Sequence, residues 1–338
     1  MAVGIIAEYN PFHNGHIKQI NWVKEHFPGE KIVVVMSDKF SQRGELTVVP
    51  FSIRKKYAKK YGVNKVIKLK FEETVQAAHI FAYNAVMKLY KAKVDKIVFG
   101  SESNNPDSML YCAKVMKEKH NEFSFALLQK MKKSGLSYPK AVSEVMKELV
   151  GESFEMPNDI LGFEYIKVIV YNNLPIKIYT LRREVGYHSD KVVDEFASAS
   201  YLRKLIYQGQ DISAYSPMTF KKVPRTTASL YWKFQKIMNH TSLKKIKRIP
   251  LISEGIENLL KKNITYPTYE SFVEACTSKR YTASRIQRII AWILNRKWKK
   301  TSNRKVKKLL KFIKKKKHKI LNQRVDKINF SFLLHLFF

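Results

Sequence analysis

The segment covering residues 3–16 constrains the fold of this chain more than any other stretch. An apolar run, Val3–Ala7, predicts a buried strand, and Asn10 followed by Pro11 ends it. A helix is expected to begin near Asn14 or Gly15, because apolar residues recur at helical spacing at positions 17, 20 and 23. A buried strand that leads within a few residues into an amphipathic helix is typical of a parallel α/β fold.

The turn between this strand and this helix carries the pattern His13-Asn14-Gly15-His16. Gly15 lets an anionic ligand approach the backbone, and the free N–H groups and dipole of a helix N-terminus favour negative charge there. His13 and His16 are expected to project from one side, where imidazoles can contact phosphate oxygens as a leaving pyrophosphate gains charge. Alone, the pattern also fits a loop with two solvated histidines; the flanking strand and helix favour the functional interpretation.

Strands and helices alternate through the following part of the sequence. Short apolar runs predict four further strands, at Lys31–Met36, Lys65–Leu69, Lys96–Phe99 and Ile176–Leu181. Helices are expected over residues 52–61, 75–90, 108–149 with a break at 134–139, and from 157 onward. This order predicts an α/β fold with a parallel, Rossmann-like sheet and right-handed crossovers. Ligands bind where such strands end, which draws attention to the polar loop at residues 37–45.

Residues that follow the later strands are candidates for contacts with a nucleotide. Gly100 would allow close approach to the backbone at a strand end, although a simple turn fits it equally well. Asn158 is a natural helix N-cap. Arg182 and Arg183 end the last strand with two guanidinium groups, which suit planar contacts with phosphate.

A second anion site is predicted further along the chain. Ser198 and Ser200 place two hydroxyl groups at a helix start, and Arg203 follows one turn later, an arrangement that suits the outer phosphates of a nucleotide. Such a pattern is most often an ordinary capped helix with a solvated arginine. Its place downstream of the histidine turn favours the functional interpretation.

The charge balance points to a polyanionic partner. Lys and Arg number 63 against 28 Asp and Glu, a formal net charge of +35. Nucleic acid suits this surplus best, although a coding bias toward lysine would also contribute, because the lysines are spread along the chain. The two cysteines, Cys112 and Cys276, lack metal-ligand spacing and are expected in a reducing cytoplasm. The apolar end at residues 330–338 is too short to span a bilayer, and no cleavable signal is recognised, so a cytoplasmic protein without a membrane partner is expected.

The texture of the sequence predicts three regions: an α/β catalytic domain over residues 1–210, a basic helical domain over 211–295, and a basic tail over 296–338. The helical domain contains a basic stretch with one aromatic residue, and its candidates for RNA contacts are Lys279, Arg280, Tyr281, Arg285 and Arg288. Basic side chains suit the RNA backbone and the tyrosine suits base stacking. A solvated helix face is the usual alternative.

Five strings in this order resemble a known family: Glu-Tyr-Asn-Pro-Phe-His-Asn-Gly-His at residues 8–16, Gln-Arg-Gly-Glu at 42–45, Phe-Gly-Ser-Glu at 99–102, and the segments at 198–203 and 279–288. The first is similar to the signature of the HIGH-type nucleotidyltransferase superfamily. Together they resemble the bacterial tRNA(Met) cytidine acetate ligases. Those enzymes use ATP to activate acetate as acetyl-adenylate, and they acetylate the exocyclic amine of the wobble cytidine in elongator tRNA(Met).

The resemblance implies the residues of the ATP site: Ile6, Ala7, Glu8, Tyr9, Asn10, Pro11, Phe12, His13, Asn14, Gly15, His16, Ile17, Lys18, Gln19, Gly100, Asn158, Arg182 and Arg183. Charge at the leaving pyrophosphate would be neutralised by the catalytic group His13, His16, Ser200 and Arg203, with Mg²⁺ bridging the phosphates. No residue stands out as a general base for acetyl transfer. Asp38 stands where a smaller residue is expected, and an acid there is expected to disturb an anionic ligand. The tail after Arg296 does not resemble the family's ending.

Two other classes of function remain open from the sequence. One is a nucleotidyltransferase that acts on a small metabolite, which would not need the basic helical half. The other is a non-catalytic RNA-binding protein with a degenerate nucleotide site. The presence of both histidines argues against this class.

Overall fold

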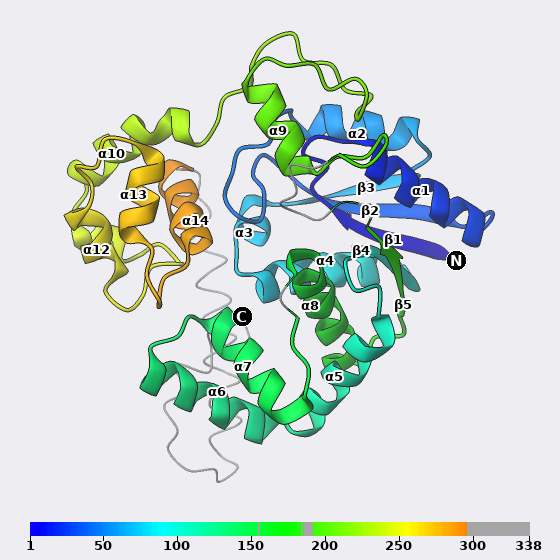
Figure 1. Ribbon diagram of the computed structural model, residues 1–338, viewed down its shortest axis with the longest axis horizontal. Coiled ribbons are helices and arrows are strands. Elements are labelled where there is room, and N and C mark those ends of the chain that lie inside the picture. Colours follow the sequence, from blue (N-terminus) through cyan, green and yellow to red (C-terminus); the bar gives the residue numbers. More distant parts are fainter. Residues whose placement is uncertain (155, 184, 186–191, 296–338) are drawn as a thin grey trace.

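A computed structural model of the chain describes residues 1–154, 156–183, 185 and 192–295. Its centre is a parallel sheet of five strands in the order β3-β2-β1-β4-β5 (Figure 1). The strands are β1 (Ala2–Ala7), β2 (Lys31–Ser37), β3 (Lys65–Leu69), β4 (Lys96–Ser101) and β5 (Lys177–Arg182). The predicted α/β fold and all five predicted strands are confirmed. The predicted tail, 296–338, lies outside the described residues.

Both faces of the sheet are covered by helices, because alternate strand residues point to opposite sides. On β2, Val33 and Val35 pack against α4 (Ala78–Lys91) and α8 (Pro157–Tyr171). The intervening Ile32 and Val34 pack with α1 (Asn14–His26) and α2 (Phe51–Lys60) on the other face. The first face is completed by α5 (Pro106–Glu118), α6 (His120–Ser134) and α7 (Tyr138–Val150).

The helix predicted at residues 75–90 begins later, as α4 at Ala78; a separate short helix, α3 (Phe71–Thr74), precedes it, with a break at residues 75–77. The break has a tertiary cause. Val75 is fully buried against the C-terminal helices, and its carbonyl oxygen accepts a hydrogen bond from Trp292 Nε1 at 2.8 Å.

A bundle of short helices lies beside the sheet and follows α9 (Ala199–Tyr207) (Figure 1). Its members are the 3₁₀ turn η1 (Ala228–Leu230), α10 (Tyr231–Asn239), α11 (Leu243–Ile246), α12 (Ile256–Lys262), α13 (Tyr269–Cys276) and α14 (Ala283–Leu294). No strand lies in this bundle within residues 211–295, as predicted. Its apolar core also takes in Phe40, Leu46 and Val75 from the sheet-containing part.

The segment at residues 211–220 packs with the sheet-containing part. Ile212 joins the cluster around Leu202 of α9, and Met218 joins the cluster around Val3 and Ile5 of β1. This packing favours a domain boundary close to η1, later in the chain than the predicted boundary at residues 210/211. The division into domains stays a prediction. Within the described ranges, no helix is both long enough and apolar enough to cross a membrane.

Candidate functional site

The candidate site lies where the strand order reverses. The chain runs from β1 outward to β2 and β3 on one side, while β4 and β5 lie on the other. The carboxyl ends of β1 and β4 therefore diverge into a crevice, which is where doubly wound sheets bind their ligands. β1 leads into the turn with His13, and β4 ends at Gly100 and Ser101.

The histidine turn is held by reciprocal hydrogen bonds at the start of α1. His13 is the N-cap, and its Nδ1 accepts a bond from Gly15 N at 3.1 Å. His13 N donates to His16 Nδ1 at 3.2 Å, and the two ring centres lie 3.8 Å apart. The two side chains thus lie side by side, as their spacing in the sequence predicted.

Burial keeps both histidines neutral. Burial lowers the pKa of His13 to about 3, helped by Arg183 and Arg203 nearby. The pKa of His16 also lies well below the usual value, through burial and then through the neighbouring His13 and Arg183. Because each Nδ1 accepts a backbone N–H, the ring proton of each neutral imidazole lies on Nε2. Two Nε2–H donors are therefore available to a ligand's oxygen atoms.

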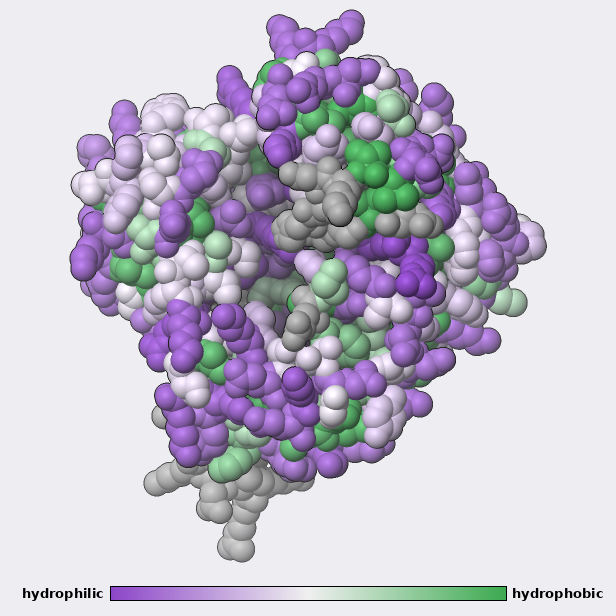
Figure 2. Space-filling view, viewed as in Figure 1, coloured by the Kyte–Doolittle hydropathy of each residue, from purple (hydrophilic) through white to green (hydrophobic). Residues whose placement is uncertain are grey.

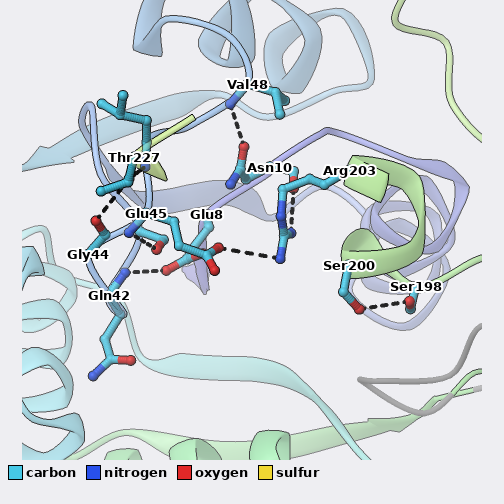
Figure 3. Close-up of polar contacts among 12 residues, drawn as sticks. Glu8, Asn10, Gln42, Gly44, Glu45, Val48, Ser198, Ser200, Arg203 and Thr227 are labelled. Atoms are coloured by element: carbon cyan, nitrogen blue, oxygen red, sulfur yellow. Dashed lines mark hydrogen bonds and ion pairs between the residues drawn. The ribbon is translucent and has the colours of Figure 1, made fainter. Parts of the chain in front are cut away.

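The second predicted anion site lies at the start of α9. Ser198 is its N-cap and accepts a bond from Tyr201 N at 3.1 Å, while the Ser198 and Ser200 hydroxyl oxygens lie 3.0 Å apart. Arg203 reaches from α9 over the end of β1, where Nη1 donates to Asn10 O at 2.9 Å and Nη2 lies 3.6 Å from Glu45 Oε2 (Figure 3). Arg203 thereby brings α9 to the histidine turn.

The Gln-Arg-Gly-Glu loop after β2 completes this side of the site. Gln42 N donates to Glu8 Oε1 at 2.6 Å (Figure 3). The Gln42 side-chain amide donates to Gln76 O at 2.6 Å. Asn10 Oδ1 accepts from Val48 N at 2.8 Å, so the turn after β1 is fixed to the same loop. These contacts hold the Glu8 carboxylate at the mouth of the crevice.

Two sequence interpretations need correction here. Asn158 is not the N-cap of α8, because Pro157 occupies the first helical position and leaves Met156 as the cap. The Asn158 amide instead donates to Glu102 Oε1 at 2.5 Å. Asp38 does not disturb an anion site, since it does not line the crevice and lies 3.2 Å from Lys68 Nζ.

Most of the predicted nucleotide-site and catalytic residues line one continuous cleft. These are Ile6, Ala7, Glu8, Tyr9, Asn10, His13, Gly15, His16, Lys18, Gln19, Gly100, Asn158, Arg182, Arg183 and Arg203. Pro11, Phe12, Asn14, Ile17 and Ser200 do not line it. Phe12 is fully buried, and the Asn14 amide donates to the carbonyl oxygens of Glu195 and Ala214, so both side chains hold the turn in place.

The cleft has a volume of about 3020 Å³ and continues from the crevice to the helical bundle. Pockets for small ligands occupy roughly 300–1,000 Å³, so a nucleotide would fill only part of it. Figure 2 shows the molecule hollowed between the bundle and the sheet-containing part, with hydrophilic side chains around much of the rim. The cleft therefore has room for a macromolecular substrate beside a nucleotide.

The predicted RNA-contact residues divide into two groups. Lys279 and Arg280 are exposed, as an RNA contact requires. The Tyr281 ring is buried, and its hydroxyl donates to Glu254 O at 2.8 Å, so the prediction that it stacks on a base is wrong for this structure. Arg285 donates to Ser253 Oγ at 2.7 Å and also lies over the Tyr281 ring.

Arg288 is unusual for a predicted phosphate contact, because it is buried. It lines the cleft with 9% of its surface exposed, and its Nε has no hydrogen-bond partner among the described residues. Burial lowers the pKa of Arg288 to about 10, with the charges of Arg285 and Arg43 adding to the effect. A buried guanidinium is costly unless it is paired, so an anion from a ligand would relieve this cost.

The sequence analysis missed an exposed aromatic residue on the cleft wall. Trp232 is 63% exposed on α10, beside Lys233 and Lys236, which also line the cleft. Tyr231, Phe234 and Met238 form the buried stripe of this helix at positions i, i+3 and i+7. That spacing leaves Trp232 outside the buried stripe, so the sequence itself indicates that this tryptophan is exposed.

Among the described residues, no three His, Cys, Asp or Glu side chains are grouped so that they could bind a metal ion.

Comparisons with known proteins agree with this arrangement. The family model "HIGH Nucleotidyl Transferase" matches residues 1–336. A tRNA(Met) cytidine acetate ligase of Mycoplasmopsis synoviae is 50% identical over 297 residues, covering 87% of this chain and 96% of the relative. One of Geobacillus sp. is 35% identical, covering 87% and 78%. A crystal structure of Thermotoga maritima TmcAL bound with alpha-thio ATP is 27% identical, with a TM-score of 0.77 over 90% of this chain and 78% of that one. The apo form of the same enzyme has a TM-score of 0.80 at 25% identity, covering 99% and 92%. The chain therefore belongs to the tRNA(Met) cytidine acetate ligases, a family of HIGH nucleotidyl transferases.

Proposed function

We propose that this chain is an ATP-dependent ligase that forms acetyl-adenylate from acetate and acetylates the wobble cytidine of elongator tRNA(Met). The observation that carries the proposal is the pair of neutral, Nε2-protonated histidines at a helix N-terminus, set at the reversal point of the sheet and open to a cleft with basic walls. Family membership supplies the reaction: the relatives are named for it, and one was crystallised with an ATP analogue.

In the first step, the acetate oxygen would attack the α-phosphate and pyrophosphate would leave. This chemistry needs alignment of the two reactants and neutralisation of charge on the leaving group. We assign the neutralisation to the Nε2–H groups of His13 and His16, with Arg203 beside them, because donors fixed before the reaction stabilise developing charge without reorganisation. Ser200 joins this group only if the start of α9 turns toward the ligand, since it does not line the cleft.

The nucleotide would lie across the crevice between β1 and β4. The predicted residues that line the cleft supply its walls, with Arg182 and Arg183 at the end of β5 near the phosphates. Gly100 fits close approach, because a Cβ there would lie only 3.3 Å from Arg183 Cγ. We propose Mg²⁺ as the companion of the ATP phosphates, held by phosphate oxygens and water, which is its common mode of binding.

The tRNA would enter along the wall formed by the helical bundle. Lys279 and Arg280 are exposed cations suited to phosphate contacts, and the buried Arg288, next to Arg285, suits a phosphate that reaches the inner wall. Trp232 takes the stacking role that Tyr281 cannot take, because its ring is open to solvent between basic neighbours. The predicted helical tRNA-binding domain and a cytoplasmic location fit this reaction and form part of the proposal.

The test is mass spectrometry of nucleosides from elongator tRNA(Met) incubated with the protein, ATP, Mg²⁺ and acetate. N4-acetylcytidine is expected only with all components present, and its yield is expected to fall at least about 100-fold in His16→Ala. A parallel assay follows ATP–pyrophosphate exchange without RNA. If the exchange rate does not depend on acetate and no acetylcytidine forms at any salt concentration, a nucleotidyltransferase acting on a small metabolite is favoured instead.

A further inference from the structure

We infer that Glu8 orients the exocyclic amine of the target cytidine and accepts its proton during acetyl transfer. The inference rests on the function proposed above, which supplies acetyl-adenylate and the cytidine but leaves the base unassigned. As the cytidine N4 attacks the acetyl carbonyl carbon, the C–N bond forms and the bond from that carbon to the AMP oxygen breaks. AMP leaves as the anion, and one N4 proton passes to the Glu8 carboxylate and from there to solvent.

The two histidines are unsuited to accept this proton. Their Nδ1 lone pairs are already engaged by Gly15 N and His13 N, at 3.1 and 3.2 Å. Their Nε2 atoms carry the ring protons, so toward a ligand they can only donate. They serve the phosphate side of the reaction, and the base must be another group.

The other carboxylates on the cleft wall are committed elsewhere. Each of four lies within ion-pair distance of a basic side chain: Glu45–Arg203 at 3.6 Å, Glu73–Lys88 at 3.1 Å, Glu164–Lys167 at 3.0 Å and Glu254–Arg285 at 3.4 Å. A fifth, Glu72, is exposed on the short helix α3, away from the strand ends. Of the carboxylates that line the cleft in the described ranges, Glu8 is the one at the crevice without an ion pair.

The position of Glu8 is fixed by the fold. It follows β1 directly, at the centre of the sheet, and its carbonyl oxygen accepts a hydrogen bond from the buried Arg54. Oε1 accepts from Gln42 N at 2.6 Å, while Oε2 accepts no bond from the described residues. A carboxylate oxygen is a natural acceptor for the N4 amine of cytosine, so Oε2 can both hold the base and receive its proton.

The surroundings of Glu8 suit a group that gains and loses a proton. Burial raises its pKa; the Gln42 N–H bond, Arg203 and Arg43 oppose the shift, and Glu45 adds to it. Two further titratable groups face it, Arg54 of α2 and Tyr165 of α8. General bases work best when their pKa is moved toward the working pH, which is the direction seen here.

The test separates the two half-reactions in Glu8→Gln, which keeps an oxygen for the Gln42 N–H bond. Acetylation of tRNA is expected to fall about 100-fold further than acetate-dependent ATP–pyrophosphate exchange does, and bound acetyl-adenylate is expected to accumulate. The acidic limb of the pH profile for acetyl transfer should disappear in Glu8→Gln and persist in Glu8→Asp. Glu73→Gln, a cleft carboxylate paired with Lys88, is the matched control and should retain both activities.

Three outcomes would overturn the assignment. If exchange and acetylation fall together in a folded Glu8→Gln protein, Glu8 serves the ATP site. If acetylation stays within about threefold of wild type, the base is another group. If wild type itself shows no acetate-dependent exchange, the proposed function fails first, and the role of Glu8 fails with it.

Discussion

At the scale of single residues, burial decides how the histidine pair behaves. An unfolded histidine titrates near pH 6.5, whereas the pKa of native His13 is lowered to about 3 and that of His16 is lowered as well. Below pH 6.5 the unfolded chain therefore binds protons that the native chain does not. The stability that neutral burial contributes is fully present above that pH and falls by about 1.4 kcal/mol per pH unit for each histidine as the pH drops toward the native pKa.

Denaturant unfolding of the ligand-free protein at pH 7.5 and 5.5 measures this effect. Wild type should lose more unfolding free energy between the two values than His16→Gln, by about 1 kcal/mol. His26→Gln, an exposed histidine at the end of α1, is the control and should follow wild type. Equal losses in wild type and His16→Gln would show that folding does not lower the pKa of His16.

Gly15 makes room for the His13 ring. A Cβ at Gly15 would lie 3.0 Å from His13 Cε1 and 3.1 Å from Nδ1, so the methyl group of Gly15→Ala must shift the His13 ring by a few tenths of an ångström. Acetate-dependent exchange should fall by about 100-fold, while stability changes little, because alanine favours helix by about 1 kcal/mol. Gly151→Ala, at a left-handed position with open space, should show the opposite pattern: lower melting temperature and normal exchange per folded protein.

The contacts that the sequence predicted correctly are those whose geometry is local. His13 and His16 meet because they are three apart on a turn, which needs no knowledge of distant residues. The burial of Tyr281 depends on its bond to Glu254, 27 positions away, and the Asn158 contact with Glu102 spans 56 positions. No local pattern records such contacts, so these two roles could not be predicted from the sequence.

At the scale of elements, the loop after β2 joins the sheet to α14. Gly44 has φ +91, and a Cβ there would lie 2.8 Å from Gln287 O and 3.0 Å from Arg288 Cα. Gly44→Ala should therefore combine backbone strain with loss of this contact, at a cost of about 2–4 kcal/mol in unfolding free energy. Gly29→Ala, with φ +77 and nothing within 4 Å, carries the backbone strain alone and is the matched control.

Hydrogen exchange of α14 amides checks where the damage falls. Protection of α14 should drop in Gly44→Ala and stay near wild type in Gly29→Ala. Similar protection in both variants would mean that the loop contact does not hold α14.

The strands could be predicted from the sequence, because the apolar run that forms β2 within residues 31–37 is visible without knowledge of its partners. The break before α4 could not be predicted in this way, since it arises from a bond between Val75 and Trp292, which lies 217 positions away.

At the scale of the whole molecule, part of the abundant positive charge lies on the wall of the cleft. Composition alone left two explanations for the surplus of 63 basic over 28 acidic side chains, a coding bias or a polyanionic partner. The structure lines one cleft with exposed cations from several elements, including Arg225, Lys233, Lys236, Lys245 and Arg248. These exposed cations would face a polyanion that enters the cleft, which fits such a partner, and the coding bias stays a second source of the surplus.

The two kinds of tRNA contact proposed for this wall differ in their dependence on salt. Trp232→Ala removes a stacking surface, so it should weaken binding by about 1–3 kcal/mol at every salt concentration and leave the slope of log K against log salt unchanged. Lys233→Ala combined with Lys236→Ala removes two phosphate contacts and should flatten that slope by about 1.4–1.8. Phe125→Ala, 66% exposed on α6 and outside the cleft, is the control for losing an exposed ring. If Trp232→Ala and Phe125→Ala bind tRNA equally well, the tRNA follows another path across the bundle.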